Sequence, residues 1–397
     1  MESLVEMVLS IDNTNTIKDI QLINLSGRLG IRYGIETEIF NPMTKIIIDP
    51  RCPYNYATYY IYGLEQVFDG NSVKYDVTPF RDIDYSTRQE LNSGMPFVIR
   101  ADRDYRIFID VEDVARIYED RYAWCDIYGK VNPTKAQRDS LPKLIPIGPE
   151  FGVQMRGKLS TILLAICNYL RGRKCSSRIL KEYLKIYAYS FVRRRRMDQF
   201  LAPVAPLPNY IFHASTLWYN EFAWTHTNLY RGEFLKACAK AGMTMEGGLY
   251  YLGEQPYILK EMPDYARYKT EYKDFIYTDR LSMDDYIRKT KQSTFVFNTP
   301  SVCECHGWKL AEYLCMGKAI ISSPLTRELP GPGLVHGENV HFVSSPEDIY
   351  PAVCKLRDDE AYRRHLEQGA RKYYEQYISP SAAILRICDR LGLKINN

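Results

Sequence analysis

Short apolar runs recur along the whole chain, and most of them are separated by stretches that have the apolar spacing of a helix. The runs predict strands at residues 45–49, 73–77, 97–100, 107–110 and 144–147, and again at 210–212, 247–252, 274–279, 295–297, 319–321 and 341–343. An imperfect alternation over 31–40 predicts a further edge strand. Short strands that alternate with helices indicate an α/β protein with doubly wound sheets.

A proline-rich stretch separates the two series of strands. Pro203, Pro206 and Pro208 lie within six residues, where they can neither continue a helix nor enter a central strand. A chain of 397 residues also exceeds the size at which a single core usually divides. We therefore expect two domains, with residues 1–205 in the first and residues 206–379 in the second.

The segment 295–324 has the clearest local pattern. The apolar run 295–297 leads into a short loop, after which apolar residues recur at helical spacing from Trp308 to Cys315. Gly317 stands where that helix is expected to end, and the run 319–321 follows directly. Strand, loop, helix, turn and strand together make a βαβ unit.

Two glutamates with seven residues between them mark this unit. Glu304 lies in the loop, and Glu312 falls on the predicted helix, where it can reach a ligand beyond the strand ends. The unpaired backbone N–H groups from His306 to Trp308 suit a diphosphate, and Gly307 lets that backbone approach the ligand closely. The paired hydroxyls of a ribose suit the carboxylate of Glu312.

This spacing resembles the donor-binding segment of GT-B glycosyltransferases, most closely the bacterial family 4 and related group 1 enzymes of surface polysaccharide synthesis. The resemblance covers residues 293–343. Those families usually have Glu-Gly-Phe-Gly near the loop, whereas this chain has Glu-Cys-His-Gly, followed by Trp and Lys309. The resemblance implies an α/β GT-B fold, with two Rossmann-like domains facing across a cleft and a last helix, in residues 380–397, packed back on the first domain.

The resemblance also implies roles for individual residues. Glu304 would hold the transferred sugar and His306 would donate a hydrogen bond to the sugar or phosphate, which makes them the catalytic candidates. A surface histidine at a helix start is the alternative for His306. Glu312 would hold the ribose. The other candidates for donor binding are Gly307, Trp308, Lys309, Arg231, His213, Asn298 and Thr299.

A cation near the diphosphate is expected in such a site. A helix is predicted over 228–241, with Asn228 as its cap and Arg231 in its first turn. An arginine there opposes the helix dipole and favours a bound anion, although a plain surface arginine fits the same pattern. The candidates on the acceptor side are Asn55, Asp110 and Asp113. An aspartate at a strand end can also be a helix cap, so both roles stay open for the two aspartates.

The implied activity is the transfer of a sugar from a nucleoside-diphosphate sugar to a hydroxyl of a glycan or lipid-linked glycan. The nucleotide sugar is then a substrate, and neither a cofactor nor a metal is expected. The glutamate spacing favours retention of the anomeric configuration. One alternative is a GT-B nucleotide-sugar epimerase, which consumes the donor without an acceptor. Another is a non-catalytic protein that binds nucleotides or glycans, the latter by stacking on some of the 33 tyrosines.

Composition indicates the setting. The chain is 46% hydrophobic and 25% charged, which is typical of a soluble globular protein. No stretch approaches the roughly 20 apolar residues of a membrane span, and the first residues lack the pattern of a signal peptide. The ten cysteines are scattered, which indicates reduced thiols and a cytoplasmic protein.

Three local patterns offer an alternative with a metal. Cys303, Cys305 and His306 could act as ligands, although no second cluster stands at zinc spacing. The pairs Asp82-x-Asp84 and Asp102-x-Asp104 match the pattern with which GT-A transferases hold a divalent metal.

Residues 158–200 combine apolar residues with a local excess of positive charge. Between Arg171 and Arg196 there are ten lysines or arginines and a single acidic residue, Glu182, which leaves a net charge of +9. The apolar and aromatic positions beside them predict an amphipathic helix on an anionic membrane, at the inner face of the cell membrane. A solvated basic face is the alternative. Nucleic-acid binding is not expected, since no known binding module accompanies the charges.

Overall fold

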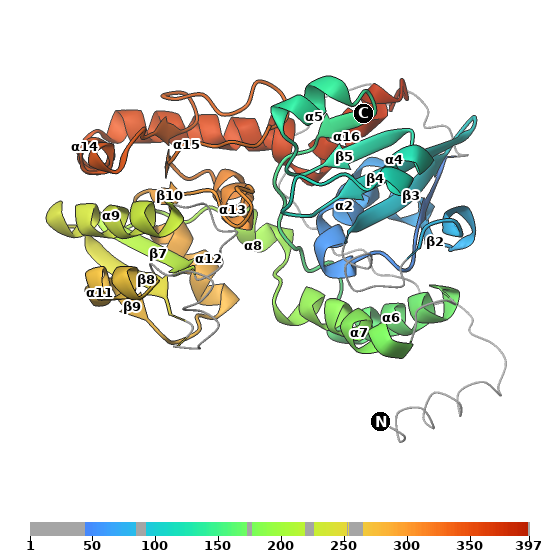
Figure 1. Ribbon diagram of the computed structural model, residues 1–397, viewed down its shortest axis with the longest axis horizontal. Helices are drawn as coiled ribbons and strands as arrows, with labels where there is room; N and C mark the ends of the chain where they lie inside the picture. Colours follow the sequence, from blue (N-terminus) through green and yellow to red (C-terminus); the bar gives the residue numbers. More distant parts are fainter. Residues whose placement is uncertain are drawn as a thin grey trace, which may run out of the picture. The chain divides into compact units, whose positions relative to one another are not determined.

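The first half of the chain is built on a six-stranded sheet with almost fully buried central strands (Figure 1). The computed structural model describes residues 44–84, 93–172, 177–218, 226–251, 253 and 265–395, so the edge strand predicted over 31–40 lies outside the described residues. The strands are β1 (Lys45–Ile48), β2 (Val73–Tyr75), β3 (Gly94–Arg100), β4 (Asp104–Asp110), β5 (Ile127–Lys130) and β6 (Leu144–Pro146). Their order is β2-β1-β3-β4-β5-β6.

This first sheet is mixed, whereas the sequence pattern predicted a doubly wound one. β3 runs antiparallel to both β1 and β4, and the other neighbours are parallel. Only residues 101–103 join β3 to β4, which is too short for the helical crossover that parallel strands need. The helices of this half are α2 (Tyr54–Val67), α4 (Glu119–Trp124), α5 (Lys135–Ser140), α6 (Lys158–Gly172), α7 (Ser177–Val192) and α8 (Met197–Leu201).

The second half contains two parallel three-stranded sheets that meet edge to edge. Their strands are β7 (Tyr210–Thr216), β8 (Thr244–Tyr250) and β9 (Ile276–Tyr277), and β10 (Val296–Asn298), β11 (Ile320–Ser322) and β12 (His341–Phe342). Where β7 meets the start of β10, the Thr294 N–H donates to the Tyr210 carbonyl at 2.7 Å. The combined order β9-β8-β7-β10-β11-β12 reverses direction between β7 and β10, which is the place where open α/β sheets bind ligands.

Six helices in the described part of this half connect or cover those strands. They are α9 (Thr227–Lys240), α11 (Tyr265–Glu271), α12 (Met283–Gln292), α13 (Trp308–Met316), α14 (Ile349–Asp358) and α15 (Glu360–Tyr373). Gly317 ends α13 in the left-handed conformation, with φ of 64°, as the sequence predicts. The predicted cap of α9 is wrong, because Asn228 lies inside the helix and its amide group binds both backbone groups of Trp218. Arg231 consequently lies in the second turn.

The last helix, α16 (Pro380–Arg390), packs against α2. The hydroxyl of Tyr59 in α2 donates to the carbonyl of Ile378, at a distance of 2.9 Å, just before α16 begins. Gly63 lies at the contact between the two helices, and a Cβ atom placed there would clash with the carbonyl of Pro380. The end of the chain is thereby fixed to the first half.

Gly63→Ala is expected to destabilise the protein by about 2 kcal/mol, because the added methyl group forces the backbones of α2 and α16 apart. Alanine is the better helix former, so helix propensity alone would raise the stability of the variant. A loss of stability can therefore be assigned to the close approach of the two helices. Urea unfolding of the variant tests this expectation. Gly157→Ala is the matched control, because its nearest neighbour would be the Ser160 hydroxyl at 3.9 Å. Equal stability of the two variants would contradict the packing argument.

The basic segment folds into α6 and α7, which lie side by side (Figure 1). The aromatic face predicted for a membrane belongs instead to the core, since Tyr183 and Tyr187 of α7 are buried. Two arginines of the run 193–196 form ion pairs: Arg195 with Asp284 at 2.6 Å, and Arg196 with Asp198 at 3.2 Å. None of the helices in the described residues combines the length and the hydropathy that a membrane span requires.

Candidate functional site

Polar side chains gather where β7 and β10 end, at the point at which the strand order reverses. His213 is buried in β7, and its Nε2 lies 2.6 Å from the Ser215 hydroxyl. Burial, together with nearby Lys309 and Arg231, holds the pKa of His213 well below its usual value, so the ring is neutral. At the end of β10, the Asn298 side-chain amide donates to the Ser322 hydroxyl at 3.0 Å. The strand ends thus form an ordered polar floor.

Two cations stand above this floor, of which Arg231 is buried and Lys309 is partly buried. Arg231 donates to the Thr299 hydroxyl at 3.0 Å and to the Thr216 carbonyl at 2.9 Å, and Lys309 donates to the Ala214 carbonyl. Within the part of the chain that the structure describes, neither cation forms an ion pair with a carboxylate. Burial lowers the pKa of Arg231 to about 10 and that of Lys309 to about 7. Cations that are removed from water without an opposing charge are costly unless an anion joins them.

Glu312 completes this group from the helix α13. Its carboxylate accepts a hydrogen bond of 2.6 Å from the Tyr286 hydroxyl, and only 6% of the residue is exposed. Burial raises the pKa of Glu312, while Tyr286, Lys309 and Arg194 act in the opposite direction. Sequence reasoning missed Tyr286, because nothing in its surroundings distinguishes it from the other tyrosines.

A cavity of about 470 Å³, here called cavity A, opens onto this group. Lys309, Glu312 and Tyr286 line one wall, and residues 214–216 at the end of β7 line another. Tyr250, Tyr277 and Arg280 also line it. Cavity A therefore combines cations, a carboxylate and aromatic rings, the groups that a nucleotide needs.

Cavity A adjoins a second cavity of about 640 Å³, called cavity B. Arg194 and Trp308 line both cavities, and the guanidinium carbon of Arg194 lies 4.1 Å from the centre of the Trp308 ring. Burial lowers the pKa of Arg194 to about 10. This role could not be predicted from the sequence, because Arg194 is one of four consecutive arginines.

Cavity B lies between the strand ends of the first sheet and the loop that precedes α13. Glu112 and Asp113 line one side, and Ser301, Cys303 and Cys305 line the other. Cys303 and Glu304 have φ of 54° and 60°, the left-handed conformation that non-glycine residues rarely adopt. The left-handed conformation of these two residues sets the direction of the side chains in the loop.

The two catalytic candidates, Glu304 and His306, line neither cavity. The Glu304 carboxylate points toward Thr326, at 3.3 Å, and Arg327, at 3.6 Å. His306 is buried, its backbone N–H donates to Asn132 at 2.8 Å, and its Nε2 lies 3.1 Å from the Arg327 carbonyl. Burial lowers the pKa of His306 to about 4. The surface position considered for His306 is therefore wrong, because the ring is enclosed, and its catalytic role stays a prediction.

The remaining donor candidates from α13 lie close to Glu312. Trp308 lines both cavities, Gly307 lines cavity B and is the N-cap of the helix, and Lys309 lines cavity A. Thr299 is the hydrogen-bond partner of Arg231. The structure thus brings His213, Arg231, Thr299, Lys309 and Glu312 together, but not Glu304.

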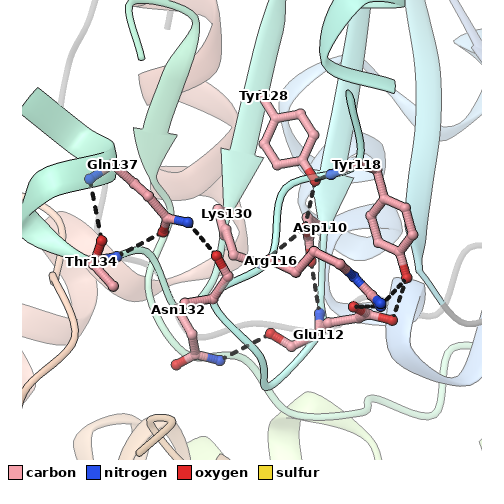
Figure 2. A network of polar contacts seen from close by, with 10 residues as sticks. Asp110, Glu112, Arg116, Tyr118, Tyr128, Lys130, Asn132, Thr134 and Gln137 are labelled. Atoms are coloured by element: carbon pink, nitrogen blue, oxygen red, sulfur yellow. Dashed lines mark hydrogen bonds and ion pairs between the residues drawn. The ribbon is translucent and has the colours of Figure 1, made fainter. Parts of the chain in front are cut away.

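The acceptor-side candidates separate into one exposed and two buried residues. Asn55 accepts a hydrogen bond of 2.9 Å from Arg194, and Asp110 forms a buried ion pair with Lys130 at 2.9 Å. Figure 2 shows that Asp110 also binds the Tyr128 hydroxyl and the Glu112 N–H, so it is neither a helix cap nor directed into a cavity. Asp113, by contrast, is exposed and lines cavity B.

A buried glutamate that sequence reasoning missed lies behind cavity B. Glu150 is only 2% exposed, and burial raises its pKa to about 8, with the charge of Asp113 as the next cause. The walls of cavity B also partly desolvate the Asp113 carboxyl group and raise its pKa. Glu150 can therefore hold or release a proton near neutral pH.

The structure also shows where the candidate metal ligands lie. In the described ranges, no three histidine, cysteine or acidic side chains come together as a metal site would require. Asp104 forms an ion pair with Arg100 at 2.7 Å, and Asp102 accepts a hydrogen bond from Tyr105 at 3.0 Å. Cys303 and Cys305 both line cavity B.

Comparison with known proteins finds no matching family model and no matching curated protein. Several solved structures are similar. A glycosyltransferase from Rickettsia africae is 13% identical over 70% of this chain and 69% of its own, with a TM-score of 0.38. Anabaena HepE in complex with UDP-glucose is 11% identical over 72% and 71% of the two chains, with a TM-score of 0.40.

Staphylococcus aureus TarM in complex with UDP is 10% identical, with a TM-score of 0.38, and the match spans 66% of this chain but only 43% of TarM. The chain is similar to GT-B glycosyltransferases.

Proposed function

We propose that the protein is a glycosyltransferase that uses a nucleoside-diphosphate sugar as its donor. The observation that carries this proposal is the pair of cations Arg231, which is buried, and Lys309, which is partly buried; neither forms a carboxylate ion pair among the described residues, and both lie near Glu312 at the sheet's switch point. A diphosphate supplies the missing negative charge, and the same cations stabilise it as it departs.

Cavity A would bind the donor. The diphosphate lies against Lys309, the Glu312 carboxylate accepts hydrogen bonds from the ribose hydroxyls, and Tyr250 or Tyr277 stacks on the base. Arg231 donates to the carbonyl of Thr216, which lines the cavity, and adds positive charge from behind that wall. The charge on the leaving group is then balanced by side chains, and we propose that transfer proceeds without a metal.

Cavity B would bind the acceptor, since it adjoins cavity A along Trp308 and carries Asp113 on its wall. In the reaction, the bond from the anomeric carbon to the diphosphate breaks and a bond from that carbon to the acceptor oxygen forms. The proton of the acceptor hydroxyl has to leave, and the Asp113 carboxylate is the candidate to receive it. We further propose a glycan or lipid-linked glycan of surface polysaccharide synthesis as acceptor, with retention at the anomeric carbon.

The first test is a thermal-shift series with UDP, GDP, ADP, CMP and their sugar conjugates, each with and without EDTA. A ligand at a hundredfold excess over its Kd stabilises the native state by about 2.7 kcal/mol. A rise with one nucleoside diphosphate that EDTA does not alter supports the proposal, and a shift lost in EDTA contradicts metal independence. Donor consumption without an acceptor identifies an epimerase, and binding without turnover a binding protein.

The affinity for the nucleoside diphosphate is expected to weaken as pH rises from 7 to 9. Burial and the charge of Arg231 lower the pKa of Lys309 to about 7, so its positive charge is present below that pH and lost above it. Calorimetric titration of the diphosphate at several pH values measures the effect. Lys309→Met is expected to bind weakly at every pH, with a flat profile. An unchanged slope in this variant would assign the titration to another group.

A further inference from the structure

Helix α6 presents four large apolar residues to the solvent, while Leu164 and Tyr169 pack against the core. Leu159, Leu163 and Leu170 are 77%, 59% and 65% exposed, and Ile166 between them is 37% exposed. Their spacing of four, three and four residues places them on one stripe of the helix. The buried positions on the opposite face are Thr161, Ala165, Asn168 and Gly172. An apolar stripe directed outward in this way indicates a surface that covers it.

A strongly basic pocket of about 600 Å³ lies at the end of this stripe. Its cations are Lys45, Lys74, Arg81, Arg100 and Arg171, and Asp76 is the acidic residue that lines it. Asp104 neutralises Arg100 at 2.7 Å, whereas the other four form no ion pair in the part of the chain described. Four cations around one hollow without an ion pair among the described residues favour a phosphate group, although Arg171 also donates a hydrogen bond to Asn168 at 3.2 Å.

Arg171 connects the two features. It follows Leu170, the last residue of the stripe, and its side chain lines the basic pocket. The stripe is about 16 Å long at the rise of an α-helix, and the segment around it carries an excess of positive charge. Apolar side chains beside cations match a lipid surface with acyl chains below and phosphates above.

We propose that α6 docks the protein on an anionic lipid bilayer. The leucine stripe enters the boundary between headgroups and acyl chains, and the basic pocket binds the phosphate of a lipid headgroup. The sequence pattern assigned this contact to the aromatic face of the basic segment, whereas the structure assigns it to α6 and adds the headgroup site. The proposal does not depend on the sugar donor, because it concerns a different surface.

The test is flotation of the full chain with vesicles of phosphatidylcholine alone and of phosphatidylcholine with phosphatidylglycerol. We expect binding only to the second kind, weaker at high salt because salt screens the lysines and arginines. The double variant Leu163→Ser/Leu170→Ser should bind the anionic vesicles with an affinity that is lower by about tenfold or more. Leu207→Ser is the matched control, since Leu207 is 44% exposed outside α6.

The pocket is tested by Lys74→Glu/Arg81→Glu, with the exposed Lys372→Glu as the matched control. We expect the pocket variant to lose its preference for anionic vesicles and the control to keep it. Circular dichroism verifies that each variant is folded. If Lys74→Glu/Arg81→Glu does not fold, Lys74→Gln/Arg81→Gln is used in its place.

Three results would overturn the proposal. One is equal binding by the wild type and both double variants. Another is a thermal shift with inorganic phosphate in the absence of vesicle binding, which would mean a site for free phosphate. The third is a change of oligomeric state in Leu163→Ser/Leu170→Ser without vesicle binding, which would mean that a second copy covers the stripe. None of these results involves sugar transfer, so the proposed function is tested separately.

Discussion

Arg231→Met is expected to reduce kcat for sugar transfer by about a hundredfold to a thousandfold, the usual cost of removing one group that stabilises developing charge in a closed site. Arg231 is buried, forms no ion pair among the described residues and donates to the Thr299 hydroxyl at 3.0 Å. It also donates to the carbonyl of Thr216, which lines cavity A, so its charge acts on the departing diphosphate through the cavity wall. Steady-state kinetics with saturating donor measures the effect.

The same substitution is expected to leave the free energy of unfolding unchanged or to raise it. Methionine removes an uncompensated buried charge and fills a similar volume. Arg231→Lys should recover part of the activity, because it restores the charge without the planar group. Lys240→Met, on the exposed end of the same helix, is the control. A variant Arg231→Met with more than a tenth of the wild-type kcat would exclude a role at the diphosphate.

Glu312→Ala is expected to raise the donor KM by about a hundredfold, because a ribose loses its charged hydrogen-bond acceptor in a buried site. The carboxylate already has an ordered position, held by the Tyr286 hydroxyl at 2.6 Å. Initial rates over a range of donor concentrations separate KM from kcat. Circular dichroism verifies that the variant is folded.

Tyr286→Phe is a milder variant whose donor KM can be compared with that of Glu312→Ala. It leaves the carboxylate of Glu312 in place and removes only the hydrogen bond that orients it, so a smaller rise, about threefold to tenfold, is expected. A fully active Glu312→Ala enzyme would remove Glu312 from the donor site. A larger effect in Tyr286→Phe than in Glu312→Ala would instead assign the ribose contact to the tyrosine.

Local patterns predicted the second half of the fold well. The strand, loop and helix from β10 to β11 and the turn at Gly317 follow from hydrophobic spacing and from a left-handed position that favours glycine. The antiparallel hairpin of β3 and β4 was missed, since two short apolar runs give no sign of their relative direction. Only the three residues that join them, 101–103, indicate a hairpin.

The candidate site was predictable only in part. Glu312 and Lys309 follow from their places at the start of α13, because a helix fixes which way its residues point. The direction of Glu304 could not be predicted, because it depends on two left-handed residues that are not glycine. Arg194 lines both cavities and Glu150 lies behind cavity B as a result of long-range packing, which no local pattern records.

Trp308 and Arg194 form a wall that cavities A and B have in common. A ligand that presses on one side of this wall changes the shape and the charge that the other side offers. Binding in the two cavities is then thermodynamically linked, and the factor by which the donor alters acceptor affinity must equal the factor by which the acceptor alters donor affinity. A compulsory order of substrate addition can therefore arise from one stacked pair of side chains.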